Sequence, residues 1–303
     1  MTGGGADAEN WTTRGERGAM ATIRLIVWIA LHLGRPATQL LLYPICFYFL
    51  IFSKASRQAS SGYLRRVLGR EPSWRDRFRH YYSFAVCVLD RVYLLNNELQ
   101  LYEVDIHNEE IAKTELEHGN GSFLFGAHLG SFEILRALGH QQAGLKLSLL
   151  MYEENARKIS SVLNAINPNL ALEVIALGQS DSMLAVEQRL DQGHLIGVLA
   201  DRDLLLGDHD RIWVDFLGSK APFPLGPFRL AAVLRRSIVL MVGLYLGGRR
   251  YEVFFERLAD FTHLTREARP EEVEQTVRRY AARLEHYCRR APYNWFNFYD
   301  FWQ

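Results

Sequence analysis

Hydrophobic residues along this chain follow two kinds of pattern, and the boundary between them lies near residue 97. Before it, apolar positions recur at three- and four-residue steps, as in Phe84, Val88, Val92 and Leu95. That spacing is typical of one face of a helix. After it, short apolar runs alternate with segments of helical spacing. The alternation predicts a sheet of mostly parallel strands that is covered by helices.

The elements of the second part can be placed by their residue ranges. Expected strands are residues 122–127, 145–151, 172–177, 194–200, 211–216, 237–246 and 251–257. Expected helices are residues 108–118, 131–140, 153–166, 179–192, 225–235 and 271–290. Gly247-Gly248 is typical of a tight turn, so the last two strands are expected to pair antiparallel. The predicted fold class is α/β, with a mostly parallel central sheet covered by helices.

Two apolar runs near the amino terminus, residues 22–33 and 40–52, are separated by a Gly-Arg-Pro break at residues 34–36. Each run is too short to span a bilayer alone. Aromatic residues such as Trp28 and Tyr43 suit the headgroup level of a membrane. We therefore expect an N-terminal helical segment that associates with a membrane through inserted or interfacial helices. The alternative is a pair of helices buried in the protein core.

These patterns predict three parts of the chain. Residues 1–13 are Gly-rich at their start and are expected to be disordered. Residues 14–97 form the helical membrane-associating region. Residues 98–303 form the α/β domain, which makes one catalytic unit with the preceding helices. No linker long enough to separate independent domains is visible between them.

Charge and cysteine content narrow the partners. The whole chain has a net charge of +1, but between Arg14 and Arg79 twelve basic residues face three acids, a net charge of +9. Such a segment favours an anionic membrane surface or an acidic protein, and no nucleic-acid partner is expected. Cys46, Cys87 and Cys288 are far apart and form no CxxC motif, which fits a reducing compartment without disulfides or a zinc site.

The strongest candidate for chemistry is the end of the run at residues 122–127. His128 follows it directly, Gly130-Ser131 supplies a turn, and Glu133 comes in the first turn of the next helical pattern. Sites of open α/β sheets lie at the carboxyl ends of strands. An ionised Glu133 could orient the imidazole of His128 and stabilise its protonated form, which makes a general base with its support. The alternative is a histidine on a turn with a glutamate on the surface.

Two more segments have similar features. The apolar run at residues 194–200 ends in Asp201-Arg202, which is expected at the same edge of the sheet as His128. Its structural alternative is an ion pair at the end of a strand. Residues 216–218 and the Pro- and Gly-rich loop at 221–229 come next, and the loop could hold an anion or a carbonyl oxygen at a helix start. It could equally be a turn that only begins a helix.

The order of these motifs resembles a known family. The motifs are His128-x4-Glu133, Asp201-Arg202, Phe216-Leu217-Gly218 and Pro224-x-Gly226-Pro227-x-x-Leu230-Ala231. Together they resemble the lysophospholipid acyltransferase superfamily, and more closely its lipid A biosynthesis (lauroyl/myristoyl) branch. The resemblance implies that His128 is the general base and that Glu133 supports it. It also implies that the acceptor and donor sites are shaped by Asp201, Arg202, Gly218, Pro224, Gly226 and Arg229.

Two features depart from the family pattern. Leu217 stands where the family often has a second Phe, and the aromatic tail around Trp295 lacks the basic residues often found there. The sequence is more similar to acyltransferases of aryl polyene pathways than to those that make lipid A, which leaves the acceptor open. The tail itself is expected either at the membrane interface or packed into the core.

The resemblance implies a membrane-associated acyltransferase at the cytoplasmic face of a bacterial inner membrane. It would move a fatty acyl group from an acyl carrier protein or acyl-CoA to a hydroxyl of a lipid or glycolipid. No cofactor or metal is expected, since the chain has no HExxH motif. One alternative is a serine-type lipid hydrolase, although no G-x-S-x-G elbow occurs. Another is a non-catalytic membrane scaffold of a lipid pathway.

Overall fold

The computed structural model describes residues 6–134, 137–138, 146–152, 166–167, 173–177, 181–202 and 211–302, with side chains from Val27 onward. Helices in this part are α1 Ala6–Phe52, α2 Lys54–Leu68, α3 Trp74–Leu95, α4 Glu109–Glu117, α7 Ser182–Asp191, α8 Gly226–Val233 and α9 Arg269–Arg290, with a 3₁₀ turn at Leu99–Leu101. Strands are β1 Glu103–His107, β2 Ser122–Gly126, β3 Leu147–Tyr152, β4 Glu173–Leu177, β5 Leu195–Leu199, β6 Arg211–Phe216, β7 Ser219–Pro224, β8 Ser237–Gly247 and β9 Arg250–Asp260. The expected helix at residues 153–166 and much of that at 131–140 lie outside the described residues.

Seven of these strands form one sheet in the order β1-β9-β8-β2-β5-β3-β4. Every neighbouring pair is parallel except β8 and β9, which are antiparallel and meet at Gly247-Gly248. The fold is therefore the α/β class that the sequence predicts, with a mostly parallel sheet and one antiparallel pair at the predicted turn. Of the predicted sheet strands, β2, β3, β4, β5, β8 and β9 are found near their expected ranges.

Three strand assignments differ from the sequence prediction. β1 was not expected, because its alternating polar residues and half-exposed pattern give a weak signal at the sheet edge. β6 was expected in the sheet, but it pairs only with β7 in a separate two-stranded ribbon. β7 contains Pro222 and Pro224, which made it look like a loop. A two-stranded ribbon tolerates them because each strand has a free edge where no backbone N–H is needed.

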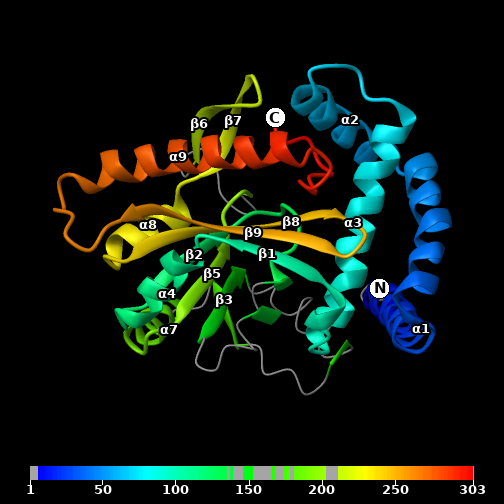
Figure 1. Ribbon diagram of the computed structural model, residues 1–303, viewed down its shortest axis with the longest axis horizontal. Helices are drawn as coiled ribbons and strands as arrows, with labels where there is room; N and C mark the ends of the chain where they lie inside the picture. The colour runs from blue at the N-terminus through cyan, green and yellow to red at the C-terminus, as the bar shows by residue number, and fades with distance from the viewer. Residues whose placement is uncertain are drawn as a thin grey trace, which may run out of the picture.

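Side chains of the sheet point alternately to two faces, and each face has its own hydrophobic cluster. Phe123 and Phe125 of β2 belong to a cluster with α8 and α9, whereas Leu124 belongs to a cluster with α3 and α4. Figure 1 shows α9 lying along one face of the sheet, with α3 across its end and α1 outside α3. The helical region before residue 97 is thus packed onto the α/β part rather than separate from it.

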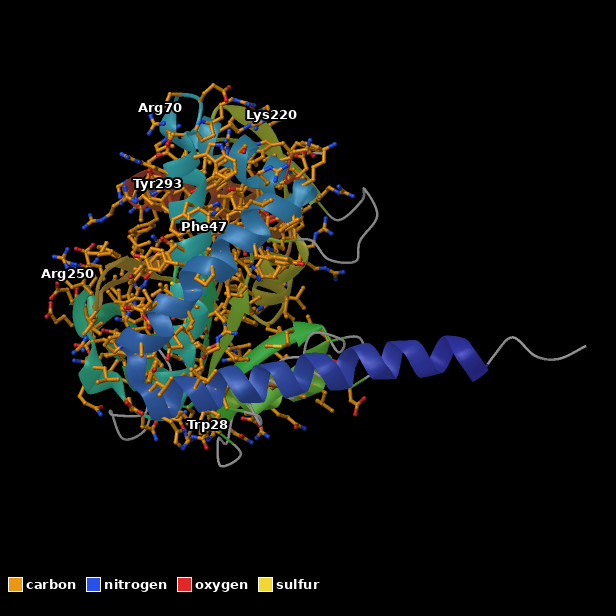
Figure 2. All side chains as sticks on the ribbon, turned by 90° about the vertical axis from the view of Figure 1, so that its right-hand side faces the viewer. Trp28, Phe47, Arg70, Lys220, Arg250 and Tyr293 are labelled. Carbon is orange, nitrogen blue, oxygen red and sulfur yellow. The ribbon has the colours of Figure 1, made fainter. Side chains whose placement is uncertain are left out.

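The amino-terminal helix has the break that the sequence predicts. α1 is two helices that meet at Gly34, whose φ of 76° and ψ of 166° are not helical. Figure 2 shows the first of them running away from the body, while the second lies along it past Phe47. Helix α1 begins at Ala6, so the range 1–13 that was predicted to be disordered is helical from that residue onward. Among the described residues, Val27–Phe52 is the one helical stretch long and apolar enough to cross a membrane by length and composition.

Candidate active site

The site begins where two adjacent parallel strands end. β2 and β5 pair in register from Ser122 with Leu195 to Gly126 with Leu199. The backbone N–H of Ala200 continues this pairing by donating to the carbonyl of Gly126 at 3.0 Å. The residues that follow each strand therefore emerge side by side at the carboxyl edge of the sheet, as expected for a site of this fold class. They are His128 after β2 and Asp201 after β5.

His128 and Asp201 are joined by two hydrogen bonds. The backbone N–H of His128 donates to Oδ2 of Asp201 at 3.0 Å, and Nδ1 of the ring lies 2.8 Å from Oδ1. Asp201 is fully buried, and its Oδ2 also accepts the indole N–H of Trp295 at 2.9 Å. The sequence analysis assigned the orienting carboxylate to Glu133. In the structure, the carboxylate at Nδ1 is that of Asp201.

The environment of Asp201 keeps it ionised. Burial by itself would raise the pKa of Asp201, but the charge and hydrogen bond of His128, the charge of Arg202 and the indole of Trp295 outweigh it and lower the pKa to about 2. An ionised carboxylate only accepts hydrogen bonds, so Nδ1 of His128 carries a proton. Nε2 is then the unprotonated nitrogen of the neutral ring, and it is available as a general base.

The turn after His128 is held by backbone bonds on two sides. Gly130 donates to the carbonyl of Asn294 at 2.8 Å, and Ser131 donates to the carbonyl of Gly243 at 2.8 Å. Gly130 has a φ of +66°, and a Cβ added to it would lie only 1.9 Å from the Gly243 oxygen. Both the left-handed backbone and the close approach to β8 require glycine here. The position of His128 is therefore fixed by its neighbours and not only by its own strand.

The carboxylate of Glu133 makes an ion pair with helix α3. Its Oε1 is 3.1 Å from Nε of Arg91, a residue of α3. Arg91 was not singled out from the sequence, because it lies near the end of an amphipathic helix, and charges on such helices usually face solvent. The pair connects the helix start after His128 to α3 and places a guanidinium beside the site.

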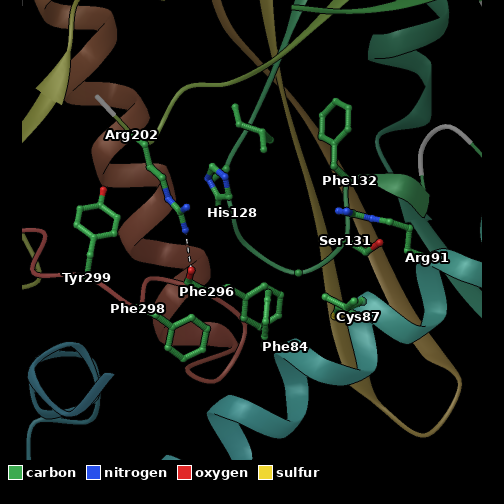
Figure 3. A pocket seen from close by; sticks show the side chains of 14 residues that line it. Phe84, Cys87, Arg91, His128, Ser131, Phe132, Arg202, Phe296, Phe298 and Tyr299 are labelled. Atoms are coloured by element: carbon green, nitrogen blue, oxygen red, sulfur yellow. Dashed lines mark hydrogen bonds between the residues drawn. The ribbon is translucent and has the colours of Figure 1, made fainter. Parts of the chain in front are cut away.

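A cleft of about 390 Å³ opens over these residues. Its lining is mostly aromatic and aliphatic, with polar groups from His128, Ser131, Arg91 and Arg202. Figure 3 shows His128 between Arg202 on one side and Arg91 and Ser131 on the other, with Phe84 and Phe296 below. The full lining is Phe84, Cys87, Val88, Arg91, Ala127, His128, Gly130, Ser131, Phe132, Leu199, Arg202, Phe296, Phe298 and Tyr299. An apolar cleft with a few convergent polar groups is the usual form of a small-molecule or lipid site.

Arg202 is held in place at the cleft wall. Its Nη2 donates to the carbonyl of Phe296 at 2.7 Å, and its guanidinium lies 5.4 Å from the centre of the Tyr299 ring. Its Nε has no hydrogen-bond partner in the described part of the chain. A fixed guanidinium with spare donors suits an anionic or polar substrate group. The structure thus brings Asp201 and Arg202 to the same edge of the sheet as His128, as the sequence predicts.

The other predicted site residues lie elsewhere. Gly218 is in the turn of the β6–β7 ribbon with a φ of +81°, and Pro224 is at the end of β7. Gly226 begins α8, and Arg229 is exposed on that helix. None of the four is among the described residues that line the cleft. Their role in substrate binding stays a prediction. In the structure they belong to the β6–β7 ribbon and to the start of α8, outside the cleft.

Sequence reasoning missed the part of the wall that comes from the carboxyl-terminal tail. Phe296, Phe298 and Tyr299 line the cleft, while Trp295 reaches Asp201 from behind. The concentration of aromatic residues after Tyr293 was the available signal. It did not say which of them face the site, because a segment without regular periodicity gives no face to assign. The prediction that the tail is packed into the core is the one that the structure supports for Trp295, which is 1% exposed.

The fold and this site define an α/β protein with a histidine and a buried aspartate beside an apolar cleft. The sequence model of the bacterial lipid A biosynthesis acyltransferase family matches residues 13–303. The chain therefore belongs to this family, and it is an acyltransferase that acts on lipid. No protein with a curated function matches the chain significantly.

Proposed function

We propose that this protein transfers a fatty acyl group from an acyl thioester to a hydroxyl of a lipid or glycolipid at a membrane surface. The observation that carries the proposal is the His128–Asp201 pair at the edge of an apolar cleft. His128 Nε2 removes the proton of the acceptor hydroxyl as its oxygen attacks the thioester carbonyl carbon. A C–O bond forms, the C–S bond breaks, and the imidazolium gives its proton to the leaving thiolate.

Two residues act around this base in our proposal. Asp201 orients His128 and stabilises the imidazolium through Nδ1. Glu133 supports the site through its ion pair with Arg91, which holds that guanidinium at the cleft. The donor is an acyl carrier protein or acyl-CoA. The basic surface of α2 and the start of α3 favours the carrier protein, because only Glu71 and Asp76 oppose its arginines there.

A serine hydrolase is the competing chemistry, because Ser131 also lines the cleft. No hydrogen bond joins the Ser131 hydroxyl to His128, although the structure describes both residues. A serine nucleophile needs that bond to its base. Direct transfer to the acceptor therefore has the better support. The test is incubation with donor alone, which should leave no acyl group on any side chain of the protein.

Arg202 is expected to hold the acceptor's polar group. Arg202→Ala should raise the acceptor's KM or lower kcat by roughly tenfold to a hundredfold, because one or two charge-assisted hydrogen bonds are lost. Donor KM should stay nearly unchanged. Steady-state kinetics with each substrate varied in turn measures this split.

Arg250→Ala is a matched control, since Arg250 is an exposed arginine at the start of β9 and does not line the cleft. Wild-type kinetics in Arg202→Ala would remove this residue from the site. An increase confined to the donor's KM would assign the guanidinium to the thioester side.

Membrane attachment is proposed to occur through the exposed face of α1. Large apolar side chains are exposed along its second half, including Leu40, Phe49 and Phe52. The opposite face packs on α3, and Arg35 is buried within that contact. A helix held along the body in this way favours an interfacial position rather than a span.

A triple variant, Leu40→Ser/Phe49→Ser/Phe52→Ser, should move the protein from the membrane pellet to the supernatant. Burying three such side chains is worth roughly 5 kcal/mol, so their loss should outweigh the remaining contacts. The measurement is the fraction that pellets with anionic lipid vesicles after a high-salt wash.

The control changes Met183, Leu184 and Val233 to Ser, because these are exposed apolar residues of α7 and α8. This control should pellet like the wild type. If the α1 variant also pellets fully after the wash, the anchor lies on another surface.

A further inference from the structure

The carboxyl-terminal tail makes a backbone pair with the turn that carries His128. Leu129 and Trp295 form an antiparallel bridge. Phe296 donates its N–H to the carbonyl of His128 at 2.7 Å, and Gly130 donates to the carbonyl of Asn294. The tail thus adds a short strand-like segment to the site, although 166 residues lie between His128 and Trp295 in the sequence.

Side chains anchor this segment from outside the site. The amide of Asn294 bonds both the N–H and the carbonyl of Tyr245 in β8, at 2.7 and 3.1 Å. The carbonyl of Trp295 accepts from Nε2 of His80, whose Nδ1 lies 2.8 Å from the Ser60 hydroxyl. Burial lowers the pKa of His80 to about 4, so this imidazole is neutral and its hydrogen bonds stay in place at ordinary pH. Ser60 of α2 and His80 of α3 therefore help to fix the backbone position of Trp295.

The indole of Trp295 contacts the carboxylate of Asp201 and does not line the cleft. Its N–H donates to Asp201 Oδ2, the same oxygen that accepts the backbone N–H of His128. The ring makes edge-on contacts with Tyr63, Phe216 and Phe301 at 5.0–5.3 Å between centroids, which leaves it one orientation. Trp295 is not among the residues that line the cleft, whereas its neighbour Phe296 is.

We propose that Trp295 is a positioning residue for acyl transfer, which acts by fixing the plane of the Asp201 carboxylate. With the indole N–H and the backbone N–H both on Oδ2, Oδ1 is left in the orientation that receives Nδ1 of His128. Without the indole, the carboxylate can rotate and the imidazole loses its fixed direction towards the cleft. This inference rests on the proposed role of His128 as the general base.

Trp295→Phe removes the N–H and keeps an aromatic ring in the core. We expect kcat to fall about tenfold to a hundredfold, the loss of one hydrogen bond to a buried charge. KM for donor and acceptor should stay as in the wild type, because the indole does not line the cleft. In an Asp201→Asn background the same change should cost little more, since residues that act as one unit are not additive.

Trp302→Phe is the matched control. Trp302 belongs to the same tail, but its indole N–H lies 3.4 Å from the carbonyl of Phe216 and the ring stacks under Arg66. Its replacement should leave kcat unchanged. If Trp295→Phe fails to fold, 3-benzothienylalanine at position 295 replaces the N–H by sulfur at nearly constant shape. This variant should give the same fall in kcat.

Hydrogen exchange gives a readout that does not depend on activity. The amide of His128 should exchange faster in Trp295→Phe than in the wild type and in Trp302→Phe, because its acceptor, Asp201, is no longer fixed. Unchanged kcat and unchanged exchange would overturn the positioning role and leave the proposed function intact. If the wild-type protein transfers no acyl group, the proposed function fails, and the exchange at His128 alone decides whether Trp295 fixes Asp201.

Discussion

Replacing His128 by alanine should lower kcat by roughly 10²–10⁴-fold, the usual contribution of a general base. The loss should appear in kcat with little change in KM, because the ring is only one of the many residues that line the cleft. The measurement is transfer of a labelled acyl group from a thioester donor to extracted lipid. Wild-type turnover in His128→Ala would exclude His128 as the general base and overturn the proposed mechanism.

Asp201→Asn should come close to this loss for a geometric reason. Oδ2 of Asp201 accepts two N–H groups, from the backbone of His128 and from Trp295, so the amide NH₂ of Asn cannot take that place. The NH₂ must face Nδ1 of His128 instead. Nδ1 then becomes the acceptor, Nε2 carries the proton, and the ring cannot act as a base.

Combining the two substitutions tests whether the pair works as a unit. The double variant His128→Ala/Asp201→Asn should lose little more than His128→Ala alone. Glu133→Gln is the comparison, and its loss should be smaller, since the carboxylate of Glu133 pairs with Arg91 rather than with Nδ1 of His128. Losses that multiply would show that His128 and Asp201 act independently.

The difference between Glu133 and Asp201 shows where sequence reasoning was sufficient and where it was not. The run at residues 122–127 and the run at 194–200 each had a clear strand pattern, and each ended in residues capable of chemistry. Placing both at one edge of a parallel sheet needed only the general rule for such sheets. Choosing the partner of His128 needed the strand order, and no local pattern states that β2 lies beside β5. A carboxylate five residues away seemed nearer than one on the adjacent strand.

The tail and the ribbon were harder for another physical reason. Trp295 is placed by single contacts to Asp201 and His80, and the preceding Asn294 by contacts to Tyr245; none of these repeats along the sequence. Periodicity reports a face that is buried over several residues, and an irregular segment has no such face. The prolines of β7 suggested a loop because the strand has a free edge that the sequence alone does not show.

The break in α1 was predicted correctly, but the ion pair that its arginine makes was not. Arg35 follows Gly34 and makes a two-point ion pair with Asp90 of α3, from Nε to Oδ1 at 2.7 Å and from Nη2 to Oδ2 at 2.9 Å. The side chains are 5% and 0% exposed. Tyr251 donates to Asp90 at 2.7 Å, and Arg35 also donates to the carbonyl of Gly248 at 2.6 Å. The pair therefore joins α1, α3 and the β8–β9 turn.

Asp90→Ala should destabilise the fold by about 3–5 kcal/mol, because it leaves the Arg35 guanidinium buried without its counter-charge. Burial opposes the charged form of Arg35, and the hydrogen bonds and charge of Asp90 outweigh it and raise the pKa above its usual value. In the variant this compensation by Asp90 is gone, and because a guanidinium stays protonated in proteins, its burial then costs stability without an offsetting charge. For a chain of this size the change corresponds to a fall in Tm of roughly 10 °C, which thermal unfolding in detergent can measure.

Two further variants separate the cost of the lone charge from the value of the pair. Arg35→Leu/Asp90→Leu removes both charges and should recover much of the lost stability, since a buried ion pair contributes little over an apolar pair of similar volume. Glu71→Ala breaks the exposed pair with Arg65 and should leave Tm almost unchanged. If Asp90→Ala unfolds at the wild-type temperature, the contact between α1 and α3 does not depend on this pair. α1 would then be held by apolar packing alone, through residues such as Leu42 and Leu50.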